Sequence, residues 1–215
     1  MDYEDMDKKI KAHNIHVAVF CNPHNPCGRV WERQELEKAL EVYKANDCVV
    51  TMYAPSKTFN LAGLIGSYHV IYNKYLRDRV RSKGSKPHYN SMNVLSMHAL
   101  IGAYKPEGHE WVDELCEVIS GNVNYGYDYI KEHFKGVEVS KPQGTYMLLL
   151  DCEEWYKVHG KTILELEKMC WDVGVACQDG QMFHVPYGLR VNLALPFERV
   201  KEAFDRLDKC VFNAE

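Results

Sequence analysis

The feature that most constrains the fold is an alternation of short apolar runs, turn-forming clusters and amphipathic segments in the N-terminal half of the chain. Residues 16–21 (HVAVFC) have the apolar, β-branched character of a buried strand, and they stop at the turn-forming cluster NPHNPCGR. Apolar residues at helical spacing predict an amphipathic helix over residues 32–46, and further strands are predicted over residues 48–54 and 66–72. This order predicts an α/β fold, with a mostly parallel sheet covered by helices.

The rest of the chain predicts a second unit of mixed helices and strands. Gly136 breaks a helical pattern, and shorter strands and helices alternate after it. We therefore expect a large domain over residues 1–108 and a smaller α+β domain over residues 109–215. The remaining predicted helices cover 74–82, 91–103, 111–134, 162–171 and 198–212, and the remaining predicted strands cover 137–139, 145–151, 175–178 and 189–195.

Charge and hydropathy argue against several classes of protein. The net charge of −4 gives no basic field for nucleic acid or for an anionic membrane. Apolar runs such as residues 147–150 are far too short to span a bilayer, and the first ten residues lack the apolar stretch of a secretory signal. We expect a soluble, cytoplasmic protein.

The cysteines and histidines give no sign of a metal centre. Eight cysteines are present, but none forms a CxxC motif or stands at zinc-finger spacing. Several of them fall in apolar runs, where a thiol behaves as a small hydrophobic group. His69, His98 and His184 stand singly on apolar stretches. Reduced thiols and no metal site are therefore expected.

Lys57 is chemically unusual. It follows a short apolar run in the sequence YAPSKTFNLAGL, with no other Lys, Arg, Asp or Glu between Val49 and Asn73. A desolvated setting of this kind makes the neutral amine available as a nucleophile. The alternative is a lysine whose stem packs at a strand end while its amine reaches solvent.

The loop of residues 22–29 (NPHNPCGR) contains two Asn-Pro steps and then Gly28, which permits a tight turn into the following helix. Such a turn would hold the side-chain amides of Asn22 and Asn25 rigidly, as a fixed hydrogen bond to a ligand oxygen requires. The alternative is a well-formed turn that binds no ligand.

Arg190 lies within the apolar strand sequence GLRVNLALP. An unpaired guanidinium is costly there, and a carboxylate would pair with it in a bidentate manner. The alternative is a salt bridge within the domain, to an acid such as Asp151.

Together, NPHNPCGRVW, APSKTFNLAGL, PQGTYMLLLD and GLRVNLALP resemble the fold-type I enzymes that use pyridoxal phosphate, the aminotransferase class I/II family. The combination of NPxNPxGRVW with SKTFN resembles especially the cystathionine (cysteine-S-conjugate) β-lyases of the MalY/PatB type. The resemblance covers nearly the whole chain in the order of the family. It implies pyridoxal 5'-phosphate as the cofactor and a homodimer with its sites at the subunit interface.

The resemblance also implies roles for individual residues. Lys57 would be the lysine that carries the cofactor, Ser56 a contact to its phosphate, and Asn25 a hydrogen-bond donor to its ring hydroxyl oxygen. Arg190 would bind the α-carboxylate of the substrate.

The implied reaction is the β-elimination of a cysteine S-conjugate such as cystathionine, which gives a thiol, pyruvate and ammonia. Asn22 and Gly144 would lie near the substrate. An aminotransferase with the same cofactor and the same Lys57 is one alternative. A non-catalytic remnant that no longer binds the cofactor productively is another.

The sequence departs from the family at three places. The family has a further segment between the strand that ends at Val50 and the strand that starts at Thr51, and this segment supplies the acid that pairs with the pyridine nitrogen. Here no acid stands between Asp47 and Lys57, and Ile65 stands near the position of a phosphate-binding arginine. The family's N-terminal half, with its phosphate cup, is also missing. We therefore expect an N-terminally truncated and internally deleted relative.

Overall fold

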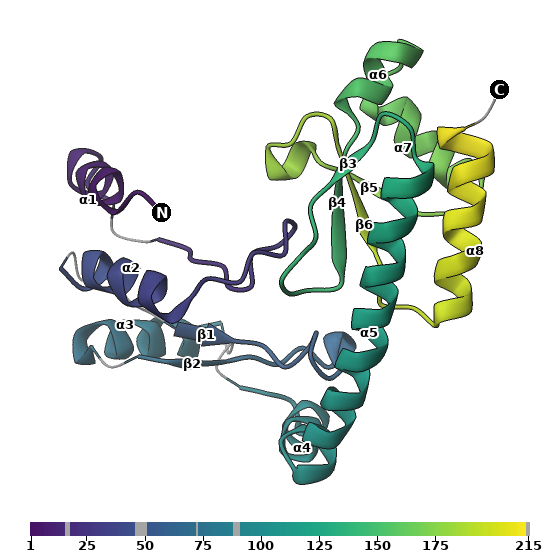
Figure 1. Cartoon of the computed structure of the whole chain (residues 1–215). Coiled ribbons are helices and arrows are strands. Elements are labelled where there is room, and N and C mark those ends of the chain that lie inside the picture. The colour runs from purple at the N-terminus through teal and green to yellow at the C-terminus, as the bar shows by residue number, and fades with distance from the viewer. Residues whose placement is uncertain (16–17, 46–50, 72, 88–90, 214–215) are drawn as a thin grey trace. The chain divides into compact units, whose positions relative to one another are not determined.

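The chain divides into two compact units (Figure 1). The structure is a computed structural model, and it describes residues 1–15, 18–45, 51–71, 73–87 and 91–213. The N-terminal unit comprises residues 1–20 and 32–115, and the C-terminal unit comprises residues 21–31 and 116–215. Residues 21–31 thus belong to the C-terminal unit, although both segments that flank them belong to the N-terminal unit.

The N-terminal unit is mainly helical in its described part. Two of its helices begin where Asn side chains cap them: Asn73 accepts a hydrogen bond from Leu76 N at 3.0 Å, and Asn93 accepts one from Ser96 N at 2.8 Å. The helices expected over residues 32–46, 74–82 and 91–103 are confirmed. The elements are α1 (Tyr3–Ala12), α2 (Arg33–Ala45), β1 (Thr51–Tyr53), the 3-10 helix η1 (Ala62–Leu64), β2 (Tyr68–Val70), α3 (Lys74–Ser85), α4 (Val94–Ala103) and the first part of α5 (Pro106–His133).

The strand pairing described in the N-terminal unit is antiparallel. β1 pairs with β2, and Met52 lies opposite His69. The expected mostly parallel sheet is not found among the described strands. Residues 54–67, which join β1 to β2, contain only the one-turn helix η1 and not the α-helix that usually crosses between parallel strands. Residues 18–20 form no strand. The other parts of the expected strands, residues 16–17, 48–50 and 72, lie outside the described residues.

The C-terminal unit is built around an antiparallel sheet with the strand order β3-β4-β6-β5. The expected α+β character of this part is confirmed, as are its helices and most of its strands. The strand expected over residues 175–178 is shorter and lies later, since 175–177 form no strand and β5 covers 178–179. Helix α6, which sequence periodicity did not indicate, is an addition. The elements are the second part of α5, β3 (Glu138–Val139), β4 (Met147–Asp151), α6 (Glu153–His159), α7 (Ile163–Asp172), β5 (Gln178–Asp179), the 3-10 helix η2 (Gln181–Phe183), β6 (Gly188–Asn192), α8 (Phe197–Leu207) and the π-helix η3 (Asp208–Phe212).

The core of the C-terminal unit is formed by its sheet together with helices α5, α6, α7 and α8. Helices α5 and α8 lie side by side in Figure 1. Gly126 on α5 permits the close approach, since a Cβ there would lie 2.9 Å from Phe204 Cζ and 3.1 Å from Leu148 Cδ1. Asn122, one turn earlier on α5, is buried and donates from Nδ2 to the carbonyl oxygens of Leu193 and Leu195, at 2.9 and 2.8 Å. The helix and the end of β6 are therefore joined by packing and by satisfied polar groups.

Within the described part of the chain, none of the helices has both the length and the hydropathy needed to cross a membrane.

Two leucines on α7 give a matched test of this core. Leu166 is fully buried, whereas Leu164, two residues earlier, is 61% exposed. We predict that Leu166→Ala lowers the free energy of unfolding by about 2–5 kcal/mol, because it removes buried methyl groups and leaves a cavity. Leu164→Ala should change it by less than about 1 kcal/mol. Urea denaturation followed by circular dichroism measures both, and equal effects of the two substitutions would contradict the assigned core.

Candidate functional site

The turn of residues 22–29 docks on the segment that precedes β4. Gly28 O accepts hydrogen bonds from Gln143 N at 2.8 Å and from Gly144 N at 3.0 Å. Gly28 adopts a φ of +68°, and a Cβ at this position would lie 2.3 Å from Pro142 Cβ. The expectation that Gly28 permits a tight turn is confirmed, and only glycine fits both the backbone conformation and the space.

Side chains strengthen this docking. Gln143 accepts a hydrogen bond at Oε1 from Val30 N at 3.2 Å, and Asn22 accepts one at Oδ1 from Trp31 N at 3.0 Å. The side-chain oxygen of Asn22 is thus used within the turn itself, and the side-chain NH₂ group of Asn22 stays available as a donor. Gly144 contacts Val30 closely, since a Cβ there would lie 2.9 Å from Val30 Cγ2.

The same turn brings Asn25 to Arg190. Arg190 Nη1 donates to Asn25 Oδ1 at 3.2 Å, and Nη2 donates to Gln178 Oε1. Gln178 lies directly opposite Arg190 in the pairing of β5 with β6, so the two side chains share one face of the sheet. The guanidinium carbon also lies 4.8 Å from the ring centroid of Phe183, within the range of a cation–π contact.

The partners of Arg190 leave its charge uncompensated. Both hydrogen-bonded partners are neutral amides, and among the described residues no carboxylate lies within ion-pair distance of the guanidinium. The alternative of a salt bridge to Asp151 is not found, since Asp151 Oδ1 instead accepts a hydrogen bond from Glu153 N. The half-buried guanidinium uses two of its five N–H groups in these contacts, so it keeps donors for an anion.

Lys57 lies in the N-terminal unit, in a turn that follows β1. Backbone hydrogen bonds close this turn, from Phe59 N to Pro55 O at 3.0 Å and from Leu61 N to Ser56 O at 2.8 Å. The expected desolvation of Lys57 is not observed, because its side chain is exposed while Pro55 is the neighbour that is buried. The apolar neighbours in sequence do not cover the amine: Ala54 is itself exposed and Phe59 is only half-buried.

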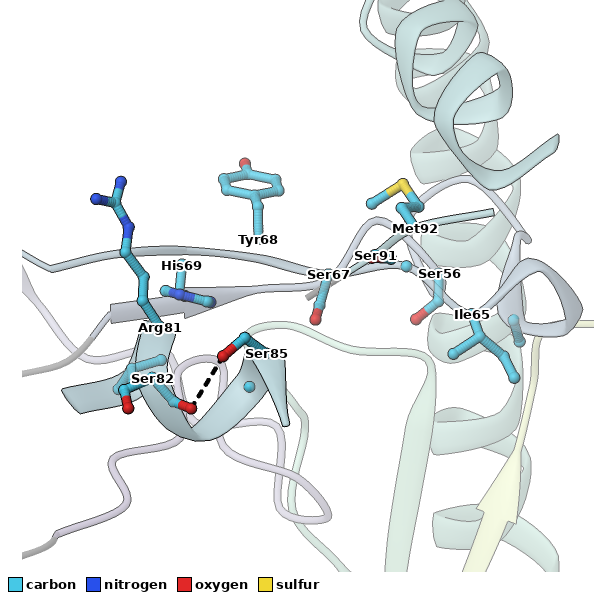
Figure 2. Close-up of a pocket in the computed structure, with 14 residues that line it drawn as sticks. Ser56, Ile65, Ser67, Tyr68, His69, Arg81, Ser82, Ser85, Ser91 and Met92 are labelled. Carbon is cyan, nitrogen blue, oxygen red and sulfur yellow. Dashed lines mark hydrogen bonds between the residues drawn. The ribbon is translucent and has the colours of Figure 1, made fainter. Parts of the chain in front are cut away.

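Ser56 lines an open cavity of about 1300 Å³ that lies within the N-terminal unit. Figure 2 shows side chains from β2 and α3 around it, with Ser85 Oγ donating to the carbonyl oxygen of Ser82 at 3.0 Å. Ile65 also lines the cavity and is 82% exposed. Lys57 is not among the lining residues, so this cavity does not enclose the amine.

The structure therefore brings together part of the predicted site. Asn22, Asn25, Gly144 and Arg190 belong to the C-terminal unit, and Ser56 and Lys57 belong to the N-terminal unit. Sequence reasoning missed Gln178 and Phe183, which contact Arg190. Gln178 reaches Arg190 through the strand register and Phe183 through η2, and no local sequence pattern contains either contact.

Comparisons with known proteins agree with the resemblance of the sequence motifs. Residues 1–52 and 43–207 match the model of the family described as aminotransferase class I and II. The chain is 25% identical to cystathionine beta-lyase PatB of Bacillus subtilis, over 96% of the chain and 61% of that protein. Among solved structures, it is similar to a PLP-bound C-S lyase of Staphylococcus hominis, with 25% identity and a TM-score of 0.87 over 100% of the chain and 63% of the lyase.

A third match is cystalysin from Treponema denticola, whose structure contains pyridoxal 5'-phosphate. The identity is 25% and the TM-score 0.84, over 98% of the chain and 61% of cystalysin. The chain thus spans about three fifths of the length of these proteins.

The comparisons also bear on the segment expected to be missing between Val50 and Thr51. The alignment with PatB extends over 241 positions, which exceeds the 215 residues of the chain, so PatB has residues inside the aligned region that this chain lacks. Both ranges matched by the family model include residues 43–52. The junction between the two matched parts thus lies within residues 43–52, a range that includes the expected junction. Val50 itself lies outside the residues that the structure describes.

Two glycines test the docking of the turn. We predict that Gly28→Ala destabilises the C-terminal unit by about 2 kcal/mol or more, because it combines an unfavourable positive φ with a steric overlap. Gly121→Ala on α5, where an added Cβ meets nothing within 4 Å, should be neutral or stabilising by up to about 1 kcal/mol. Thermal or urea unfolding of the variants measures the difference. A Gly28→Ala variant as stable as the parent would contradict the docked turn.

Proposed function

Because the chain belongs to the aminotransferase class I and II family, we propose that it is a pyridoxal-phosphate-dependent carbon–sulfur β-lyase. The proposed substrates are cysteine S-conjugates such as cystathionine, and the products are a thiol, pyruvate and ammonia. The observation that carries the proposal is the Arg190 guanidinium, held by Asn25 and Gln178 with no carboxylate partner among the described residues. Similarity to PatB and to the C-S lyase of Staphylococcus hominis supports the choice of reaction.

The side chains present fit the attachment of pyridoxal phosphate. An exposed primary amine without a partner in the described structure can react with an aldehyde, and Lys57 offers one. Asn25 accepts from Arg190 through Oδ1, so its NH₂ group can donate to an oxygen of the ring. The sequence between Asp47 and Lys57 supplies no acid for the pyridine nitrogen.

The proposed roles follow from these chemical groups. When bound, the cofactor supplies an electron sink for negative charge at the substrate's Cα atom. Arg190 binds the α-carboxylate through parallel N–H···O bonds and thereby fixes the orientation of the substrate. The Lys57 amine takes the Cα proton as a general base, and removal of this proton allows the β-thiolate to leave.

A second candidate function is that of a non-catalytic relative, and the exposure of Lys57 favours it. An exposed lysine is solvated by water, so it lacks the desolvation that would make its neutral amine available as a nucleophile. Ile65, exposed at the wall of the cavity, cannot bind a phosphate as an arginine would. Both features predict weak cofactor binding and slow turnover.

The first test is attachment of the cofactor rather than activity. We predict that addition of pyridoxal phosphate produces a visible absorption band, and that borohydride reduction fixes the label on Lys57. Peptide mapping by mass spectrometry identifies the labelled residue, and exposed Lys74 and Lys86 serve as internal controls. Lys57→Arg should abolish the band, because a guanidinium does not form the adduct. A label spread equally over surface lysines would refute the proposed site.

If Lys57 is labelled, two assays separate the possible reactions. Release of a thiol from cystathionine indicates β-elimination, whereas exchange between an amino acid and a keto acid indicates an aminotransferase. Labelling of Lys57 without either activity would support the non-catalytic alternative.

We also propose that the chain forms a homodimer in the cytoplasm. The support for self-association is helix α4, on which the apolar side chains of Val94 and Leu95 are 64% and 71% exposed. Every cysteine in the described part of the chain is a free thiol, which supports a reducing compartment.

Light scattering tests the proposed dimer. We expect twice the 24.9 kDa mass of the chain at micromolar concentration, and a shift towards the monomer in Leu95→Glu. Leu164→Glu, at an exposed leucine of α7, is the matched control. A parent chain that stays at 24.9 kDa would contradict the proposal.

A further inference from the structure

Cys27 and His24 form a pair of reactive side chains in the turn that docks on the C-terminal unit. His24 Nδ1 lies 3.0 Å from Cys27 Sγ, and the Cys27 side chain is exposed. We infer that Cys27 is a reactive thiol that forms mixed disulfides with small disulfide compounds, and that His24 accepts the proton of the thiol. This inference is independent of the proposed lyase activity, because it uses neither Lys57 nor a cofactor.

The backbone holds this pair in place. His24 N donates to Arg29 O at 2.7 Å, and Gly28 N donates to His24 O at 2.7 Å, so residues 24–29 form a closed turn. Gly28 in turn docks on residues 142–144. The contact between imidazole and thiol is therefore built into a fixed turn. A nucleophile within hydrogen-bond reach of a base is the arrangement that activates cysteine.

The other cysteines in the described part of the chain lack this arrangement. Cys152 and Cys177 are buried: burial raises the pKa of the Cys152 thiol, and a hydrogen bond to Cys170 together with burial raises the pKa of Cys177. Both remain inert thiols. Among the exposed cysteines, Cys21 donates from Sγ to the carbonyl oxygen of Pro23 at 3.3 Å, which is a contact of the protonated form.

The chemical step is thiol–disulfide exchange. The Cys27 proton moves to His24 Nδ1, and the thiolate attacks one sulfur of the small disulfide. A new S–S bond forms at Cys27 as the original S–S bond breaks, and the departing thiolate takes a proton from the imidazolium or from water. No net oxidant is needed beyond the disulfide itself.

The class of reactant follows from exposure and from the position of the turn. Cys27 is accessible to solvent, so a small molecule can reach Sγ without opening the fold. Asn25, two residues away, accepts the hydrogen bond from Arg190. A group attached to Cys27 would therefore be carried by the same short turn that presents Asn25.

Alkylation rates test the pair directly. Iodoacetamide is added to the full chain at pH 7, and peptide mapping by mass spectrometry gives the rate at each cysteine. An ordinary thiol is only about 3% thiolate at pH 7, so a base that takes up the proton increases the reactive fraction. The gain in rate is limited, because the thiolate of a more acidic thiol is a weaker nucleophile. We therefore expect Cys27 to react about three- to tenfold faster than the exposed Cys116 and Cys210, which serve as internal controls.

His24→Gln should lower the Cys27 rate to that of the two control cysteines, since it removes the base but keeps the backbone turn. His13→Gln, at an exposed histidine beyond α1, is the matched control and should leave the rate unchanged. Circular dichroism verifies that each variant is folded. If His24→Gln does not fold, the alkylation rates of Cys27, Cys116 and Cys210 in the parent chain still test whether Cys27 is unusually reactive.

Two results would overturn the inference. One is a Cys27 rate no higher than those of Cys116 and Cys210, and the other is a folded His24→Gln variant that reacts as fast as the parent. With oxidised glutathione as the probe, the first mixed disulfide should map to Cys27, and a first adduct at Cys116 or Cys210 would likewise contradict it.

Discussion

The docking of a short turn against a distant segment is the contact on which the candidate site depends. Gly28 O accepts hydrogen bonds from the backbone amides of Gln143 and Gly144, and its own positive φ and missing Cβ allow the approach to Pro142. This contact anchors residues 21–31 in the C-terminal unit, although the segments on either side of them belong to the other unit. This contact also holds Asn25 beside Arg190.

Once Asn25 is held there, the electrostatics of Arg190 follow. Its described partners are the amide oxygens of Asn25 and Gln178 and the ring of Phe183, which orient the guanidinium without neutralising it. A fixed and uncompensated cation at the surface of a sheet is suited to bind a carboxylate. The same turn places an imidazole against a thiol, so its rigidity serves two kinds of chemistry.

Much of the fold was predictable from the sequence, because helices α2, α5, α7 and α8 carry strong apolar periodicity. The motifs also identified Asn25 and Arg190, which the structure brings together.

Other features depend on tertiary contacts. The apolar run that ends near residue 21 forms no strand over 18–20, and none of the described strands pairs with it. Lys57 is exposed although its sequence neighbours are apolar. The domain boundary expected near residue 109 falls inside α5 and stays a prediction.

Hydrogen exchange of the amides of Gln143 and Gly144 tests the central claim most directly. Both amides donate to Gly28 O, at 2.8 and 3.0 Å, so their exchange should be slowed well below the rate of an unstructured peptide. Their protection should fall in Gly28→Ala while that of the α5 amides is kept. Exchange of both amides at the unstructured rate in the parent chain would show that the turn is not docked. The placement of Asn25 at Arg190, and the account built on it, would then be wrong.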